Sequence, residues 1–209
     1  MVFVVGNADG GQSTGNDIAY YDAHARDYAE PTRQIDLSRI HDRFLAHVRP
    51  GGLILDVGSG AGRDTLAFLE RGFEVEAIEP SSELAAATEE FTGIAPRRIR
   101  VQELCEVNKF DGIWACASLI HVPHGELQDA VDRIAIAAKP SAPIYISFKL
   151  GVGERTASDG RRFSDLDEVG LRTLVDQIDC LTIDECWISD GEGIARGRNR
   201  WINAILVRV

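Results

Sequence analysis

Apolar positions along the chain follow two periods, and the change between them divides the sequence near residue 50. Before that point, apolar residues recur every three or four positions, which predicts amphipathic helices over 17–28 and 37–48. After it, short apolar runs alternate with helical segments. The pattern predicts strands at 53–57, 73–78, 98–102, 110–116, 143–148, 181–188 and 201–208, and helices over 63–71, from about 81, over 125–138 and over 167–178.

This alternation of strand and helix predicts an α/β fold with a mostly parallel sheet that helices cover on both faces. No helix is predicted between the last two strands, so we expect them to form a hairpin at the sheet edge, with the last strand antiparallel. Residues 6–16 are rich in Gly, Asn, Ser and Asp, and we expect 1–16 to be a disordered tail. Residues 17–209 would then form one domain.

Composition and charge narrow the function classes. No apolar run approaches the roughly 18 residues that a membrane span needs, and the N-terminus lacks the pattern of a signal peptide, so we expect a cytoplasmic protein that binds no membrane. The formal net charge of −11 disfavours nucleic acid as a partner. The four cysteines form no C-x-x-C pair, and His121 and His124 alone are weak evidence for zinc, so no metal site is predicted.

A glycine-rich turn follows the strand at 53–57 and carries the main chemical signal. It places Gly58, Ser59, Gly60 and Gly62 between a strand and a helix, where open α/β sheets bind their ligands. The dinucleotide fingerprint G-x-G-x-x-G would need a glycine where Arg63 stands. The mismatch argues against a pyrophosphate at this turn.

Two acidic residues flank the turn and indicate the kind of cofactor. Asp56, at the end of the first strand, suits a ligand with an ammonium group better than one with two phosphates. Glu79 ends the second strand and can accept hydrogen bonds from both hydroxyls of a ribose. NAD and S-adenosylmethionine (SAM) both have a ribose, but SAM has an ammonium group and no phosphate and fits better. The alternative is a tight packing turn beside a solvated acid.

The segment LDVGSGAGRDTLAFLERGFEVEAIEPSSEL resembles the first two motifs of class I SAM-dependent methyltransferases. The resemblance continues through FDGIWACASLIHVPHGEL, AAKPSAPIYISFKLGVGER, DGRRF and RWINAILVR, and YYDAHARDYAE extends it to nearly everything after residue 17. The chain is similar to small bacterial type 11 and tellurite-resistance-like methyltransferases. This resemblance implies a Rossmann-like, seven-stranded sheet, with residues 17–48 as a helical cap over the cofactor and substrate site.

The resemblance also implies roles for individual residues at the cofactor site. The turn would line the methionine and ribose parts of SAM, Asp56 would meet the ammonium directly or through water, and Glu79 would bind the ribose. Many relatives carry an Asp after the third strand, whereas this chain has Arg100–Glu103, which leaves the adenine contacts there open. The expected cofactor contacts are Asp56, Gly58, Ser59, Gly60, Gly62, Glu79, Pro80, Ser81, Ala117 and Tyr28, where Tyr28 is either a cap or a core residue.

His121 and a group of cations are the candidates for the acceptor side. His121 follows the fourth strand and could remove or orient a proton of the acceptor, or it could tether the loop. Cations gather after the fifth strand and could bind an anionic acceptor, or they could balance Glu154, Asp159 and Asp165. Trp201 would wall the pocket or fill the sheet edge. The expected substrate contacts are Lys149, Arg155, Arg162 and Trp201.

The sequence therefore predicts an enzyme that moves the methyl group of SAM to an O, N or S atom of a small molecule by in-line displacement, with S-adenosylhomocysteine as product. A nicotinamide-dependent oxidoreductase and a non-catalytic SAM-binding module are the alternatives. The sequence predicts neither the acceptor nor the oligomeric state.

Overall fold

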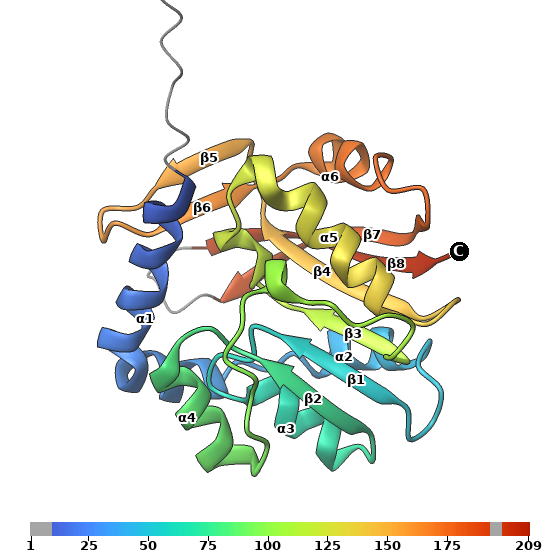
Figure 1. Cartoon of the computed structure of the whole chain (residues 1–209), viewed down its shortest axis with the longest axis horizontal. Helices are drawn as coiled ribbons and strands as arrows, with labels where there is room; N and C mark the ends of the chain where they lie inside the picture. The colour runs from blue at the N-terminus through green and yellow to red at the C-terminus, as the bar shows by residue number, and fades with distance from the viewer. Residues whose placement is uncertain (1–9, 193–197) are drawn as a thin grey trace, which may run out of the picture.

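The computed structural model describes residues 10–192 and 198–209, and Figure 1 shows the course of the chain. The helices are α1 Gly10–Arg33, α2 Ser38–Leu45, α3 Arg63–Glu70, α4 Ser82–Thr92, α5 Leu127–Ala137 and α6 Glu168–Val175. The strands are β1 Leu53–Val57, β2 Glu74–Ile78, β3 Gly112–Ala115, β4 Pro143–Lys149, β5 Gly153–Thr156, β6 Arg162–Asp165, β7 Leu181–Glu192 and β8 Arg198–Arg208. No helix in the two described ranges is both long and apolar enough to cross a bilayer.

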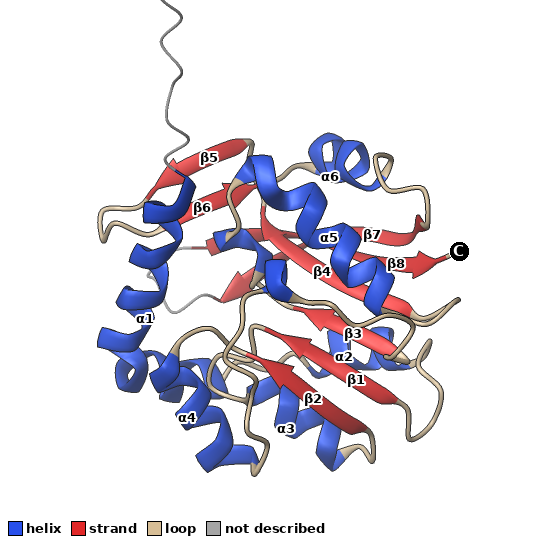
Figure 2. Cartoon of the chain, in the orientation of Figure 1, coloured by secondary structure: helices blue, strands red, loops and turns tan. Residues whose placement is uncertain are grey.

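The main sheet has the strand order β2-β1-β3-β4-β8-β7, with helices on both faces (Figure 2). The strands β2, β1, β3 and β4 pair in parallel, and β8 pairs antiparallel with β4 and with β7. This arrangement confirms the predicted α/β class, the mostly parallel sheet and the antiparallel last strand. The order of the parallel strands along the sheet reverses between β1 and β3, so the loops after these strands border the position where open α/β sheets bind ligands.

The sheet has six strands, one fewer than predicted, because the strand expected at 98–102 does not form. Arg97 makes a single parallel bridge to Ile78, and the chain then enters a 3-10 turn over Val101–Glu103. The Glu103 side chain accepts a hydrogen bond from the Arg100 amide, which closes this turn and prevents further pairing along β2.

Two further segments differ from the sequence prediction. The helix α1 begins at Gly10, so residues 10–16 are helical rather than part of a tail, and residues 1–9 lie outside the described ranges. The polar stretch after β4 was expected to be a loop, but β5 and β6 pair there as an antiparallel hairpin. Apolar Phe163 and Leu166 in and beside β6 are buried, which gives this polar segment a core contact.

Successive residues of the central strands point to two separate cores. In β1, Leu55 faces the core that contains α5 and α6, whereas Ile54 faces the core against α2 and α3. The second core is aromatic, and its centre is Trp114, stacked on Tyr145 with ring centroids 4.0 Å apart. Both sides of the sheet are buried, so the strands read as continuous apolar runs.

A buried carboxylate fixes the amino-terminal end of the sheet. Asp111, just before β3, accepts hydrogen bonds from the Leu53 amide (2.9 Å), from Arg49 Nε (2.7 Å) and from Lys139 Nζ (2.8 Å). These donors hold the pKa of Asp111 well below its usual range, with the Arg49 hydrogen bond as the largest cause. Asp111 thereby links the starts of β1 and β3 to the segment before β4.

We expect Asp111→Ala to lower the free energy of unfolding by about 2 kcal/mol at pH 7, because the Leu53 amide and two cations lose their acceptor. The folded state holds Asp111 ionised at a depressed pKa, so this contribution is present above pH 4 or so and shrinks as the pH falls below that value. Urea denaturation at pH 7 and pH 3 measures both effects. Glu90→Ala, on the exposed side of α4, is the control. Equal losses at the two pH values would contradict the ionic assignment.

Candidate cofactor and acceptor site

The turn between β1 and α3 requires glycine at three positions. Gly58, Gly60 and Gly62 have φ angles of +71°, +58° and +83°, in the left-handed region that favours glycine. A Cβ on Gly58 would also lie only 2.6 Å from the Ser118 Cβ. The Gly58 and Ser59 amides both donate to the Ile78 carbonyl, which holds the turn against the end of β2.

Glu79 joins this turn to the turn after β2. Its Oε2 accepts from the Gly60 amide and its Oε1 accepts from the Ser81 amide, both at 2.9 Å. The residue is only 6% exposed, and burial raises the pKa of Glu79 to about 6. Each carboxylate oxygen has a second lone pair, so both can still accept a hydrogen bond from a ligand hydroxyl.

A cavity of about 90 Å³ lies beside the turn. Ser118, whose hydroxyl Oγ is buried and has no hydrogen-bond partner, lines it. Ala117, the preceding residue, has a φ of +53°, and its amide donates to Ser147 Oγ. The walls come from Gly58, Ile78, Pro80, Gln102, Ser118, Leu119 and His121, with Asp17 and Ile18 of α1 closing one side. These residues provide a mostly apolar slot with one unused polar group.

Several predicted cofactor residues serve the turn rather than the cavity. Ser59 directs its hydroxyl to Thr88 of α4, at 3.2 Å, so only its backbone faces the turn. Ser81 caps α4 by accepting from the Leu84 amide and donates its hydroxyl to Asp22 of α1. Pro80 lines the cavity.

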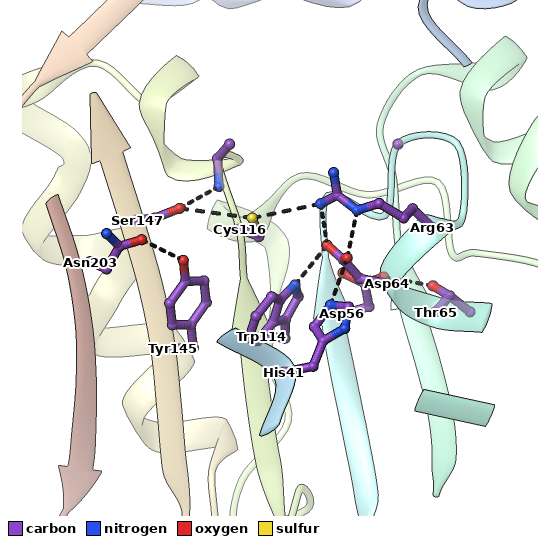
Figure 3. Close-up of polar contacts among 12 residues, drawn as sticks. His41, Asp56, Arg63, Asp64, Thr65, Trp114, Cys116, Tyr145, Ser147 and Asn203 are labelled. Atoms are coloured by element: carbon purple, nitrogen blue, oxygen red, sulfur yellow. Dashed lines mark hydrogen bonds and ion pairs between the residues drawn. The ribbon is translucent and has the colours of Figure 1, made fainter. Parts of the chain in front are cut away.

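Asp56 lies beneath the turn. It is 2% exposed, its Oδ2 accepts a hydrogen bond from Thr65 Oγ1 at 2.6 Å, and burial is the main cause that raises its pKa (Figure 3). A ligand above the turn would reach this carboxylate most easily through a water molecule.

Asp64, at the start of α3, is the centre of a buried polar network (Figure 3). Its carboxylate accepts from Arg63 Nε and Nη2, both at 2.7 Å, and from His41 Nε2 and Trp114 Nε1, both at 2.9 Å. The neighbouring Arg63 charge and these donors hold the pKa of Asp64 far below its usual range. The four donor atoms belong to three residues on three elements, α2, β3 and the start of α3, so Asp64 holds the Arg63 side chain in one position.

Arg63 occupies the position where a dinucleotide fingerprint has its third glycine. Its side chain is 16% exposed, and its Nη2 also lies 3.8 Å from Cys116 Sγ at the end of β3. In Figure 3 the remaining nitrogen, Nη1, points away from Asp64, beyond the carboxyl ends of the strands. A fixed guanidinium here can donate to an anionic group of a ligand held by the turn.

The helix α1 crosses the carboxyl ends of the strands beside this turn (Figure 1). Asp22 docks it by accepting from Ser81 Oγ and from the Glu83 amide at the start of α4. Tyr28 lies over the turn, since a Cβ on Gly60 would lie 3.6 Å from its ring and 4.0 Å from its hydroxyl. This geometry places Tyr28 at the cofactor turn rather than in the apolar core.

His121 forms a hydrogen-bonded pair with Tyr21 of α1. His121 Nδ1 lies 2.9 Å from the Arg162 carbonyl, which can only accept, so Nδ1 carries the proton. His121 Nε2 is then free to accept from the Tyr21 hydroxyl, 2.8 Å away. Burial lowers the pKa of His121 to about 4, and the nearby Arg161 and Lys149 charges add to this effect. The imidazole is therefore neutral, with a defined tautomer, at neutral pH.

The predicted acceptor cations differ in how they are paired. Arg155 donates through Nε and Nη2 to Asp165, and Arg162 donates to Glu154 at 3.0 Å. Lys149 has no salt bridge among the residues that the structure describes, and it pairs in register with Trp201 across β4 and β8. Arg161, another of the cations that gather after the fifth predicted strand, donates to the Tyr21 hydroxyl at 3.2 Å.

Gly58, Gly60, Glu79, Pro80 and Tyr28 thus lie in or beside one turn, and Gly58, Pro80 and His121 line the adjacent cavity. Sequence reasoning missed Tyr21, Arg63 and Ser118 as residues of the site. Arg63 had a signal, because it interrupts the glycine fingerprint, and Tyr21 lies in the YYDAHARDYAE segment. The contact of α1 with residues about 100 and 140 positions away has no local signal.

Comparisons with known proteins show what this chain is similar to. A family model described as a methyltransferase domain matches residues 54–141, and no curated protein matches the sequence. The solved structure of a Burkholderia thailandensis 1,6-didemethyltoxoflavin-N1-methyltransferase, with 1,6-didemethyltoxoflavin and S-adenosylhomocysteine bound, is 19% identical. The two structures superpose with a TM-score of 0.80, covering 99% of this chain and 93% of that one.

Two further structures share the fold. A SAM-dependent methyltransferase from Methanosarcina mazei is 17% identical, with a TM-score of 0.70 over 84% of this chain and 99% of that one. A Rhodobacter sphaeroides protein named for zinc-dependent alcohol dehydrogenases is 12% identical, with a TM-score of 0.74 over 95% and 99%. At these identities the likeness concerns the fold. Together with the domain match, it confirms the resemblance to class I SAM-dependent methyltransferases; the tellurite-resistance-like subgroup stays a prediction.

We expect His121 to remain neutral and protonated at Nδ1 from pH 5.5 to pH 8, because its pKa lies near 4 and the Arg162 carbonyl fixes the tautomer. Nitrogen-15 NMR of the imidazole measures both properties. Tyr21→Phe should shift the Nε2 resonance by removing its donor, whereas Tyr20→Phe, at the adjacent position, should leave it unchanged. An imidazolium signal appearing between pH 6 and pH 7 would show the assignment to be wrong.

Proposed function

We propose that the enzyme methylates a small molecule, with SAM as the methyl donor, at the site between the glycine turn and His121. Two findings support this: residues 54–141 match a family model described as a methyltransferase domain, and the chain shares the fold of a methyltransferase structure with S-adenosylhomocysteine bound. The observation that carries the proposal is the buried Glu79 carboxylate, which is bonded to both turns and still has lone pairs for two hydroxyls. We propose residues 17–209 as one functional domain, with α1 and α2 as its cap. A cytoplasmic location stays a prediction.

The residues at the turn fit SAM on three points. Gly60 carries no Cβ on the side that faces Tyr28, so a ligand can approach the backbone closely. Glu79 would bind the ribose, and Pro80 would lie beside the adenine in the apolar slot. The orphaned Ser118 hydroxyl offers a donor and an acceptor to whatever fills that slot. Gly58, Ser59, Gly62 and Ala117 would contribute backbone contacts.

The methionine end of SAM carries an ammonium and a carboxylate, and the site offers a partner for each. Arg63, held by Asp64, would donate to the carboxylate, with the Tyr28 hydroxyl close to it. Asp56 would balance the ammonium through water. The small size of the cavity beside α1 implies that this helix moves to admit the cofactor and then closes over it.

SAM would supply the activated methyl group. Transfer requires that the acceptor atom lie in line with the bond between the methyl carbon and the sulfonium sulfur, and that water be excluded from the site. The chain has to hold the acceptor and manage its proton. Tyr21 and His121 lie where α1 meets the loop after β3, so the closed cap would bring both to the acceptor. His121 Nε2 can accept a hydrogen bond from an O–H, N–H or S–H nucleophile, directly or through Tyr21.

The fold alone does not separate this proposal from a nicotinamide-dependent oxidoreductase, since one neighbour is named as a dehydrogenase. The turn favours SAM, because Arg63 and Asp64 occupy the helix start where a pyrophosphate would need free amides. Isothermal calorimetry with S-adenosylhomocysteine and with NAD distinguishes the two. Tighter binding of NAD would end the proposal.

We expect S-adenosylhomocysteine to bind about tenfold more weakly at pH 5 than at pH 7.5, because the proton on Glu79, whose pKa is about 6, competes with the ribose hydroxyls. Calorimetry in two buffers of different ionisation enthalpy should detect the released proton. Glu79→Gln should weaken binding at pH 7.5 and remove most of the pH dependence. Glu83→Gln, an exposed position on the first turn of α4, should change neither. An unchanged pH dependence in Glu79→Gln would refute the assignment.

The role of Arg63 has a separate test, based on 5′-methylthioadenosine, which lacks the amino-acid end of the cofactor. Arg63→Met should weaken S-adenosylhomocysteine about tenfold or more through the lost charge-assisted hydrogen bond, and should leave 5′-methylthioadenosine unchanged. Arg71→Met, at the other end of α3 in a surface ion pair, is the matched control. Equal losses for both ligands would indicate that Arg63 only supports the turn.

A further inference from the structure

Lys149 ends β4 at the carboxyl edge of the sheet and presents its ammonium to one aromatic ring. Its Nζ lies 3.7 Å from the ring centroid of Phe163 in β6. The Phe163 ring also contacts the His121 ring, with the two ring centroids 4.9 Å apart. Lys149 is thus one aromatic ring away from the residue that faces the acceptor.

Three cations share the Phe163 ring, and only two of them have a carboxylate. The guanidinium carbons of Arg155 and Arg161 lie 4.5 Å and 5.3 Å from the same ring centroid. Arg155 is bonded to Asp165, and Arg161 is bonded to Asp159 at 2.7 Å. Lys149 makes no hydrogen bond or salt bridge with any residue in the described ranges. Of the three cations on this ring, Lys149 is therefore the one without a direct carboxylate partner in the described part of the chain.

An uncompensated ammonium in this position is costly. Lys149 is half-buried, and burial together with the Arg155 and Arg161 charges lowers the pKa of Lys149 to about 8. An anion bound beside it would remove part of that cost, because it would neutralise the Lys149 charge and accept hydrogen bonds from the ammonium. Arg155 and Arg162 have less to gain, since each is already paired with a carboxylate.

We infer that Lys149 is the specificity residue for an acidic group of the methyl acceptor, so that the enzyme acts on small organic anions such as carboxylates. This inference rests on the proposed function, because it assigns the acceptor class at the same site. The acidic group would lie against Lys149 on the side open to solvent, and the nucleophilic atom would face His121 and Tyr21. Phe163 separates the two positions.

The test uses the enzyme saturated with S-adenosylhomocysteine and three carboxylates, acetate, benzoate and indole-3-carboxylate, each compared with its neutral amide. Calorimetry or ligand-observed NMR should show at least one carboxylate binding about tenfold more tightly than its amide. Lys149→Met should abolish this preference and leave the affinity for the amide unchanged.

Lys109→Met is the matched control, because Lys109 also lies over a phenylalanine ring, Phe110, but at the amino-terminal end of the sheet. It removes the same charge from the chain and should preserve the carboxylate preference. The inference is overturned if no carboxylate binds more tightly than its amide, or if Arg155→Met loses more of the preference than Lys149→Met. Binding of S-adenosylhomocysteine is measured first. If S-adenosylhomocysteine does not bind, the proposed function fails. Titration of the free enzyme with the same carboxylates and amides then still tests the role of Lys149.

Discussion

The buried carboxylate of Asp64 is the interaction on which the site depends. It takes one hydrogen bond each from His41 and Trp114 and two from Arg63, so it connects α2, the aromatic core of β3 and the cofactor turn. A buried charge of this kind is tolerated only when all its lone pairs are used. The network that satisfies the Asp64 carboxylate therefore also fixes the Arg63 guanidinium in one position. Trp114 of the aromatic core is part of this network, so the core helps to orient Arg63 at the turn.

The two helices of the cap are attached differently, because α2 packs into the aromatic core through Phe44 whereas α1 is docked by a series of polar contacts. The helix α1 reaches α4 through Asp22 and the hairpin through Tyr21 and Asp17, whose carboxylate accepts from the Arg162 amide. Hydrogen bonds of this type contribute about 1 kcal/mol each and can exchange with water. This attachment suits the proposed opening and closing of α1, and the hydrogen bond from Tyr21 links the position of α1 to His121.

Burial and pairing decide the chemical state of the site. Glu79 and Asp56 are acids whose pKa values burial raises, and His121 is a base whose pKa burial lowers. Burial therefore favours the neutral form of all three side chains. Hydrogen-bond donors or a positive charge on a bound ligand would favour the ionised form of Glu79 and Asp56. On the acceptor side, ion pairing leaves Lys149 as the cation without a carboxylate in the described part of the chain.

The sequence by itself determined the α/β class, the mostly parallel sheet, the antiparallel last strand and the position of the glycine turn between β1 and α3. These follow from local patterns: apolar periodicity, glycines that adopt positive φ, and a carboxylate at each strand end. Only the tertiary structure decided that the 98–102 segment stops after one bridge, that Tyr21 bonds His121, and that Arg155 and Arg162 are paired while Lys149 is not. Those outcomes depend on which side chains the fold brings within reach of the same partner, whether across one hairpin or from α1 to the loop after β3, and local sequence patterns do not show which pair meets.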